Sequence, residues 1–189
     1  MKYVISGTNR PGSKTLMVAK HIQKIYADAG EQIEVIDLQE LGLNDIIGHY
    51  GDTAPDPMKA AIKKINSSDG LIVVVPEYNG SYPGAFKYFI DHWSYPNSFE
   101  FRPVCFVGLG WTFGGLRPVE HLQGVFSYRN AFIYPERVFM MNAPKYVTEE
   151  AIGDAPVVAL LKSQMTGFRK FCRALGDAKL TANEKPAQA

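Results

Sequence analysis

Residues 71–75 form an unbroken apolar run, Leu-Ile-Val-Val-Val, and this run constrains the fold more than any other part of the chain. Successive side chains of a β-strand point to opposite faces of its sheet, so this strand would be apolar on both faces. Such strands are typical of a mostly parallel sheet that helices cover on both sides. The run therefore predicts the central strand of an α/β protein.

The other apolar segments alternate along the chain with segments of helical periodicity. Further strands are predicted at residues 2–6, 32–38, 103–109 and 130–134. Helices are predicted at residues 15–29, 57–67, 83–93, 115–127 and 156–175, with Asp56 as the N-cap of the second of them. This alternation indicates one α/β domain with a parallel sheet and right-handed crossovers. We expect the domain to span residues 1–178, followed by a polar, disordered tail at residues 179–189.

The overall composition excludes several classes of protein. The formal net charge of the 189 residues is +1, so we expect neither a nucleic-acid nor a membrane partner. No apolar run is long enough to span a bilayer, and the chain starts in a strand-like segment instead of a signal peptide. Cys105 and Cys172 lie among apolar neighbours without metal-binding spacing, which predicts buried, reduced thiols and a cytoplasmic protein.

The loop at residues 6–15 (SGTNRPGSKT) joins the first predicted strand to the first helix and carries glycines, hydroxyls and Arg10. Free backbone N–H groups and the dipole of a helix start favour a bound anion, although a solvent-exposed turn capped by Ser13 is the alternative. Lys14 stands one position too late for a Walker A loop, which argues against that motif, and the Rossmann fingerprint is absent. Asp37, after the second strand, is better explained as a solvated strand end than as a ribose ligand. The loop suits a single terminal monophosphate.

Two further loops follow the third and fourth predicted strands. Residues 76–84 (PEYNGSYPG) place an acid, an aromatic ring and an amide after the most apolar strand, and turn chemistry alone explains only the Asn-Gly pair. We expect this loop to bond the edge of a flat heterocycle. Residues 108–117 (GLGWTFGGLR) carry two aromatic side chains that either cover a ring or pack against a neighbouring helix or subunit. Parallel sheets bind ligands beyond the carboxyl ends of their strands, where all three loops lie.

These three motifs together resemble the NADPH-dependent FMN reductase family. The resemblance rests on SGTNRPGSKT, on LIVVVPEYNGSYPGAFKYFID and on FGGLRP, and it extends over about residues 1–175. It implies a flavodoxin-like three-layer sandwich with a five-stranded parallel sheet in the order 2-1-3-4-5. It also implies FMN as cofactor, NADPH or NADH as co-substrate, and a homodimer or homotetramer with the site at the subunit interface.

The family's functional positions carry over onto this sequence residue by residue. The positions that match the family's phosphate contacts are Thr8, Arg10, Ser13, Thr15 and Leu16. Those that match its contacts to the ribityl chain and the ring edge are Pro76, Glu77, Tyr78, Asn79, Gly80 and Ser81. Those that match the third loop, which closes on the flavin, are Gly114 and Gly115.

The expected chemistry belongs to the flavin, so no side chain is predicted as a catalytic acid or base. Trp111 and His92 are candidate substrate contacts, because the segments around them depart from the family pattern. The acceptor stays open among small molecules: a free flavin, a quinone, an azo compound or a metal oxyanion. A flavin-binding electron carrier or sensor, and a nucleotide-binding protein, are the rival hypotheses.

Overall fold

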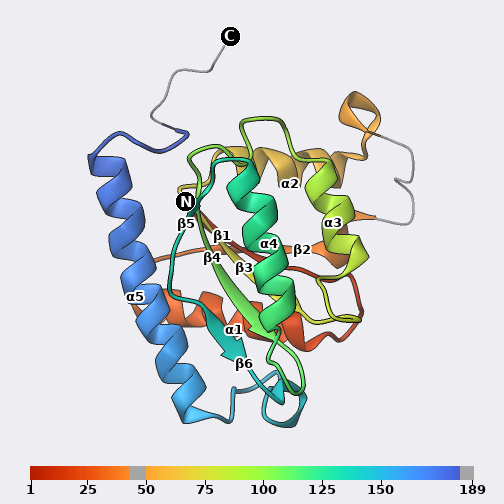
Figure 1. The fold of residues 1–189 in the computed structure, drawn as a ribbon, viewed down its shortest axis with the longest axis vertical. Coiled ribbons are helices and arrows are strands. Elements are labelled where there is room, and N and C mark those ends of the chain that lie inside the picture. Colours follow the sequence, from red (N-terminus) through yellow and green to blue (C-terminus); the bar gives the residue numbers. More distant parts are fainter. Residues whose placement is uncertain (43–49, 184–189) are drawn as a thin grey trace.

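The protein is built around a parallel β-sheet. The computed structural model describes residues 1–42 and 50–183. Within them, the main strands follow the order β2-β1-β3-β4-β5, and every strand pair is parallel (Figure 1). This order confirms the expected flavodoxin-like sheet. The strands are β1 (Lys2–Ser6), β2 (Glu34–Asp37), β3 (Gly70–Pro76), β4 (Pro103–Leu109) and β5 (Phe132–Ile133).

The edge strand beside β4 is broken into two pieces. β5 pairs with the start of β4, and β6 (Val138–Met140) pairs with its end. Pro135 lies between the two pieces and has no N–H group to donate to the sheet. The strand predicted at residues 130–134 therefore covers only the first piece, and β6 was not predicted.

Helices cover both faces of the sheet, as the apolar run at residues 71–75 predicted. One face carries α1 (Lys14–Asp28) and α5 (Ala155–Asp177). The other carries α2 (Asp56–Asn66), α3 (Gly84–Asp91) and α4 (Leu116–Tyr128) (Figure 1). All residues of β3 and β4 are buried between these two layers.

The helix starts show how local sequence sets the boundaries. Ser13 caps α1 and Asp154 caps α5, each accepting a hydrogen bond from a backbone N–H group of the first turn. Asp56 was predicted as the cap of α2, and this was wrong. Asp56 is the first residue of the helix, and Pro55 takes the cap position without a side-chain hydrogen bond.

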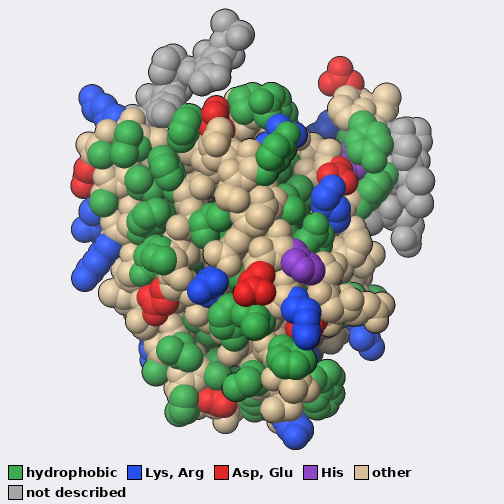
Figure 2. Space-filling view, viewed as in Figure 1, with side chains coloured by type: hydrophobic (Ala, Val, Ile, Leu, Met, Phe, Trp, Pro, Cys, Tyr) green, Lys and Arg blue, Asp and Glu red, His purple; other side chains and the backbone are tan. Residues whose placement is uncertain are grey.

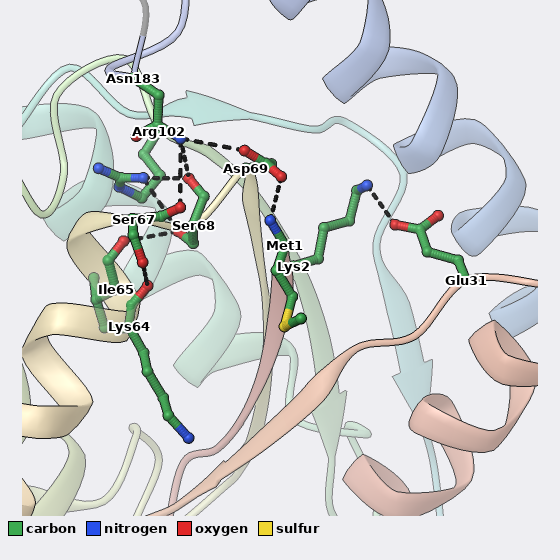
Figure 3. Close-up of polar contacts among 10 residues, drawn as sticks. All are labelled: Met1, Lys2, Glu31, Lys64, Ile65, Ser67, Ser68, Asp69, Arg102 and Asn183. Carbon is green, nitrogen blue, oxygen red and sulfur yellow. Dashed lines mark hydrogen bonds and ion pairs between the residues drawn. The ribbon is translucent and has the colours of Figure 1, made fainter.

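A buried cation joins α2 to the segment before β4. Arg102 is 2% exposed, and its guanidinium donates to four backbone carbonyls. Figure 3 shows Arg102 beside one of these acceptor residues, Ser68. The acceptors are the carbonyls of Asn66 and Asn97 at 2.8 Å each, of Ser98 at 3.1 Å, and of Ser68. No carboxylate forms an ion pair with it in the described chain, and burial lowers the pKa of Arg102 to about 10. The guanidinium stays charged at neutral pH and is stabilised by carbonyl dipoles.

The ordered chain continues past the predicted domain end at residue 178. Thr181 is buried, and the Ala182 N–H group donates to the carbonyl of Phe101 at 3.3 Å. The Asn183 amide donates to the Ser68 carbonyl and to Asp69, both at 3.2 Å. Within the segment predicted as a tail, Ala182 and Asn183 thus contact the segment before β4 and the end of α2. Residues 184–189 lie outside the described residues.

Candidate functional site

The three predicted loops meet at the carboxyl edge of the sheet. They form a cavity of about 460 Å³, within the usual range for small-molecule sites. The cavity is lined by Arg10, Pro11, Gly12, Ser13, Lys14, Thr15, Pro76, Glu77, Tyr78, Leu109, Gly110, Trp111 and Pro144. A cavity therefore lies at the edge of the sheet where the sequence predicted the site.

The start of α1 offers hydrogen-bond donors to this cavity. The Ser13 hydroxyl accepts from the Leu16 N–H group at 3.2 Å, and the Ser13 carbonyl accepts from the Met17 N–H group at 3.3 Å. The N–H groups of Lys14 and Thr15 precede the first intrahelical bonds and have no partner in the described chain. Leu16, a predicted contact, does not line the cavity.

Thr8 supports the loop that carries Arg10 without lining the cavity. It is fully buried and does not line the cavity, unlike Arg10. Its hydroxyl oxygen lies 3.2 Å from the Tyr78 hydroxyl and accepts from the Arg10 N–H group at 3.3 Å. Thr8 therefore links the first loop to the second and holds the backbone of Arg10.

The second loop is a tight hairpin. Tyr78 and Ser81 pair with each other, through N–H···O distances of 2.9 and 3.1 Å. Asn79 and Gly80 form the two-residue turn, with φ of 51° and 79°. Such turns favour Asn-Gly because both central residues need positive φ. Residues 76–78 line the cavity, whereas the predicted contacts at residues 79–81 form the projecting tip.

Gly114 and Gly115 of the third loop allow close packing and do not line the cavity. A Cβ on Gly115 (φ 80°) would lie 2.5 Å from the backbone nitrogen of Leu109. A Cβ on Gly114 would lie 3.0 Å from the backbone nitrogen of Met141. Both glycines thus let the start of α4 approach the ends of β4 and β6. Trp111 does line the cavity and is 60% exposed.

An ion pair that the sequence did not reveal lies at the cavity wall. Arg117 Nη1 donates to Glu77 Oε1 at 3.0 Å, and the guanidinium of Arg117 lies 4.4 Å from the ring centroid of Phe113. The Glu77 side chain is only 15% exposed. The Glu77 N–H group also donates to the Leu109 carbonyl at 3.0 Å. The second loop, the third loop and α4 are joined at this point.

Several lining residues were missed for different reasons. Lys14 and Gly110 belong to loops that the sequence singled out, so their loop membership was an available signal. Pro144 belongs to the 3₁₀ turn η3 (Ala143–Lys145) after β6. Nothing local marks Pro144, because its place depends on β6 pairing with β4.

Asp37 has a structural role, as its sequence context indicated. Its carboxylate accepts from the Gln39 N–H group at 3.0 Å and caps the 3₁₀ turn η1 (Leu38–Leu41). It does not line the cavity. The interpretation of Asp37 as a strand-end residue is therefore preferred over a ribose contact.

His92, a predicted substrate contact, lies away from the cavity. It follows the last turn of α3, is 8% exposed, and stacks on Tyr50 with ring centroids 4.5 Å apart. The edge of the Tyr88 ring contacts it from another side at 5.0 Å. Neither ring nitrogen of His92 has a hydrogen-bond partner in the described chain. Sequence proximity to the second loop was misleading, because α3 carries His92 away from it.

The burial of His92 predicts a pH-dependent stability. Burial lowers the pKa of His92 below its ordinary value, against the opposing effect of Asp91. Below pH ~6.5 the unfolded chain then binds more protons than the folded one, so acidification destabilises the fold. We expect His92→Phe to reduce the loss of melting temperature between pH 7.5 and pH 5.5. The control His21→Gln keeps His92 and should keep the full loss; equal losses in wild type and His92→Phe would contradict this account.

The two cysteines are buried, unpaired thiols, as predicted. Burial raises the pKa of Cys172 to about 12 and that of Cys105 well above its ordinary value, so neither supplies a thiolate at neutral pH. Among residues 1–42 and 50–183, no cluster of side chains could hold a metal ion. No helix in the same ranges is long and apolar enough to cross a membrane.

The fold is flavodoxin-like, with a cavity at the carboxyl edge of its parallel sheet. The chain belongs to the NADPH-dependent FMN reductase family, whose sequence model matches residues 3–145. This membership confirms the resemblance that the three loop motifs indicated. The chain is thus an NAD(P)H-dependent flavin oxidoreductase with FMN as cofactor.

Individual relatives cover most of the chain. An FMN reductase (NADPH) from Pseudomonas aeruginosa is 33% identical over 146 residues, which cover 74% of this chain and 75% of that protein. A quinone reductase from Escherichia coli is 30% identical over 173 residues, covering 87% and 91% respectively. The structure of FerB, a flavoenzyme NAD(P)H:(acceptor) oxidoreductase from Paracoccus denitrificans, superposes with a TM-score of 0.71 over 92% of this chain and 97% of that one. At 23% identity, that likeness concerns the fold alone.

Proposed function

We propose that the cavity at the carboxyl edge holds FMN, with the phosphate at the start of α1. The observation that carries this placement is the pair of unpartnered N–H groups of Lys14 and Thr15, beside Arg10 on the same cavity wall. Helix N-termini favour anions, and a guanidinium forms strong charge-assisted hydrogen bonds with phosphate. The hydroxyls of Ser13 and Thr15 add further polar groups to the same wall.

The ring of the cofactor would lie toward the second and third loops. Residues 76–78 and Trp111 line this part of the cavity and supply two aromatic side chains. The hairpin tip at residues 79–81 would reach the ring edge through the Asn79 amide and its backbone. Gly114 and Gly115 would act indirectly, by keeping the third loop close to the sheet.

The reaction couples a nicotinamide to an acceptor through the flavin. A flavin held in this cavity would supply the hydride and electron transfer, while the residues of the protein would orient the partners and set the electrostatics. We propose that Trp111, exposed at the cavity wall, contacts the nicotinamide or the acceptor. Relatives described as quinone reductases and azoreductases support a small-molecule acceptor such as a quinone or an azo compound. A free flavin and a metal oxyanion are the other candidate acceptors.

Anaerobic titration tests this function directly. Purified protein loaded with FMN should lose its absorbance near 450 nm when NADPH or NADH is added, and should recover it when a quinone follows. An electron carrier would fail to bleach with either nicotinamide, and that outcome would contradict the proposal. Released cofactor that proves not to be FMN would contradict it as well.

The assembly and location are also proposals. We propose a homodimer or homotetramer, because a groove of about 640 Å³ between α3 and α4 is flanked by the exposed rings of Tyr95 and Tyr128. The face that α3 and α4 form carries hydrophobic side chains among charged ones (Figure 2). Sedimentation equilibrium tests this assembly, since a monomer at micromolar concentration would overturn it.

We propose a cytoplasmic location, in keeping with the unpaired thiols, which cell fractionation would test.

A further inference from the structure

We propose that the Glu77–Arg117 ion pair sets the reduction potential of the bound flavin by cancelling the one carboxylate on the cavity wall. Glu77 is the only acidic residue among those that line the cavity in the described chain. Arg117 does not line it and acts on the cavity through Glu77, so we class it as a positioning residue. This inference rests on the proposed placement of FMN.

The structure holds the pair in place from several sides. The Glu77 side chain is 15% exposed and the Arg117 side chain 47% exposed, and the Glu77 carboxylate accepts a charge-assisted hydrogen bond from Arg117 at 3.0 Å. The guanidinium of Arg117 also lies over the ring of Phe113, 4.4 Å from its centroid. The two charges therefore lie together at the wall of the cavity.

Charge explains the consequence for the flavin. Uptake of hydride would give the neutral, oxidised isoalloxazine ring of FMN one additional negative charge, while the nicotinamide would leave as its oxidised cation. A nearby uncompensated carboxylate would oppose that charge, and an uncompensated guanidinium would favour it. At an effective dielectric constant of about 20, one charge within about 12 Å changes the ratio of reduced to oxidised flavin about tenfold. For a two-electron couple, a tenfold change corresponds to about 30 mV.

Opposite charge changes at the two positions provide the test. Arg117→Gln leaves Glu77 alone and should lower the ratio of reduced to oxidised flavin about tenfold at a fixed potential. Glu77→Gln keeps an oxygen acceptor for Arg117 and should raise that ratio about tenfold. The double variant restores neutrality and should return close to the wild-type potential. Arg173→Gln, at the opposite edge of the sheet, is a control for net charge and should leave the potential unchanged.

The midpoint potential should be measured by anaerobic titration against a reference dye, on protein saturated with FMN. A purely structural role of the pair would shift both single variants in the same direction, or change FMN affinity without changing the potential; either result would overturn the proposal. Arg117→Gln could fail to hold FMN, and two other variants then provide the test. Arg117→Lys keeps the positive charge and must show the wild-type potential. Glu77→Gln must show the raised potential.

Different results would contradict the role of the ion pair and the placement of FMN. If alanine at Arg10 and Ser13 leaves FMN affinity unchanged, the placement of FMN is wrong, whatever the potentials show. If those changes abolish binding but the variants at Glu77 and Arg117 leave the potential unchanged, only the role of the ion pair is wrong.

Discussion

Replacing Arg10 and Ser13 together with alanine is expected to weaken FMN binding about 100-fold. Both residues line the cavity beside the free N–H groups of α1. Hydrogen bonds to charged groups contribute about 1.5–3 kcal/mol each, so two of them account for about 3 kcal/mol or more. A loss of that size raises Kd about 100-fold. Quenching of FMN fluorescence during titration with apoprotein measures the change.

A matched control separates this effect from a general loss of charge or helix stability. Lys20→Ala with Ser67→Ala also removes one cation and one hydroxyl, but neither residue lines the cavity. The control should keep wild-type FMN affinity. Ser13 also caps α1, so the test variant should lose about 1 kcal/mol of folding stability. Full FMN affinity in the folded test variant would place the phosphate elsewhere.

Arg102→Met is expected to destabilise the fold by about 4 kcal/mol. Removing the guanidinium leaves the carbonyls of Asn66, Ser68, Asn97 and Ser98 without their shared donor. Unsatisfied buried polar groups cost about 1–3 kcal/mol each, although water entering the site offsets part of that cost. Arg102→Lys should recover little, because an ammonium has three donors and lacks the planar geometry of the guanidinium. Urea denaturation measures the free energy of unfolding.

Arg129→Met provides the comparison for Arg102. Arg129 lies 4.3 Å from the ring centroid of Tyr95 and 4.7 Å from that of Tyr128, and both rings are exposed. Exposed cation–π contacts contribute about 0.5–1 kcal/mol, so this variant should lose no more than about 1–2 kcal/mol. Equal losses for the two variants would show that the carbonyl cluster around Arg102 contributes nothing special.

Much of the sheet could be predicted because its signals are local. The apolar run at residues 71–75 implies burial on both faces, and the structure buries the whole of β3. The strand at residues 103–109 matches β4 residue for residue. β6 escaped prediction because a three-residue strand has too few side chains for a periodic pattern, and it forms only where β4 offers free backbone groups.

The candidate site was predictable as a set of loops, and less so as a set of contacts. Arg10, Ser13 and Thr15 line the cavity, because a helix start orients its first turn in a standard way; their contact with a phosphate stays a prediction. Thr8 and Gly115 were also chosen, yet they support the wall from behind. Sequence spacing shows which loop a residue belongs to, but the direction of its side chain depends on neighbouring strands.

By itself, the sequence determined the class of fold, the order of its elements and the loop that begins α1. These properties follow from hydrophobic periodicity, helix capping and backbone donors, all of which operate over a few neighbouring residues. Only the tertiary structure decided that Pro144 joins the cavity, that His92 leaves it and that Arg117 meets Glu77. Those relations join residues far apart in the chain, and they arise only when the sheet brings separate loops and helices together.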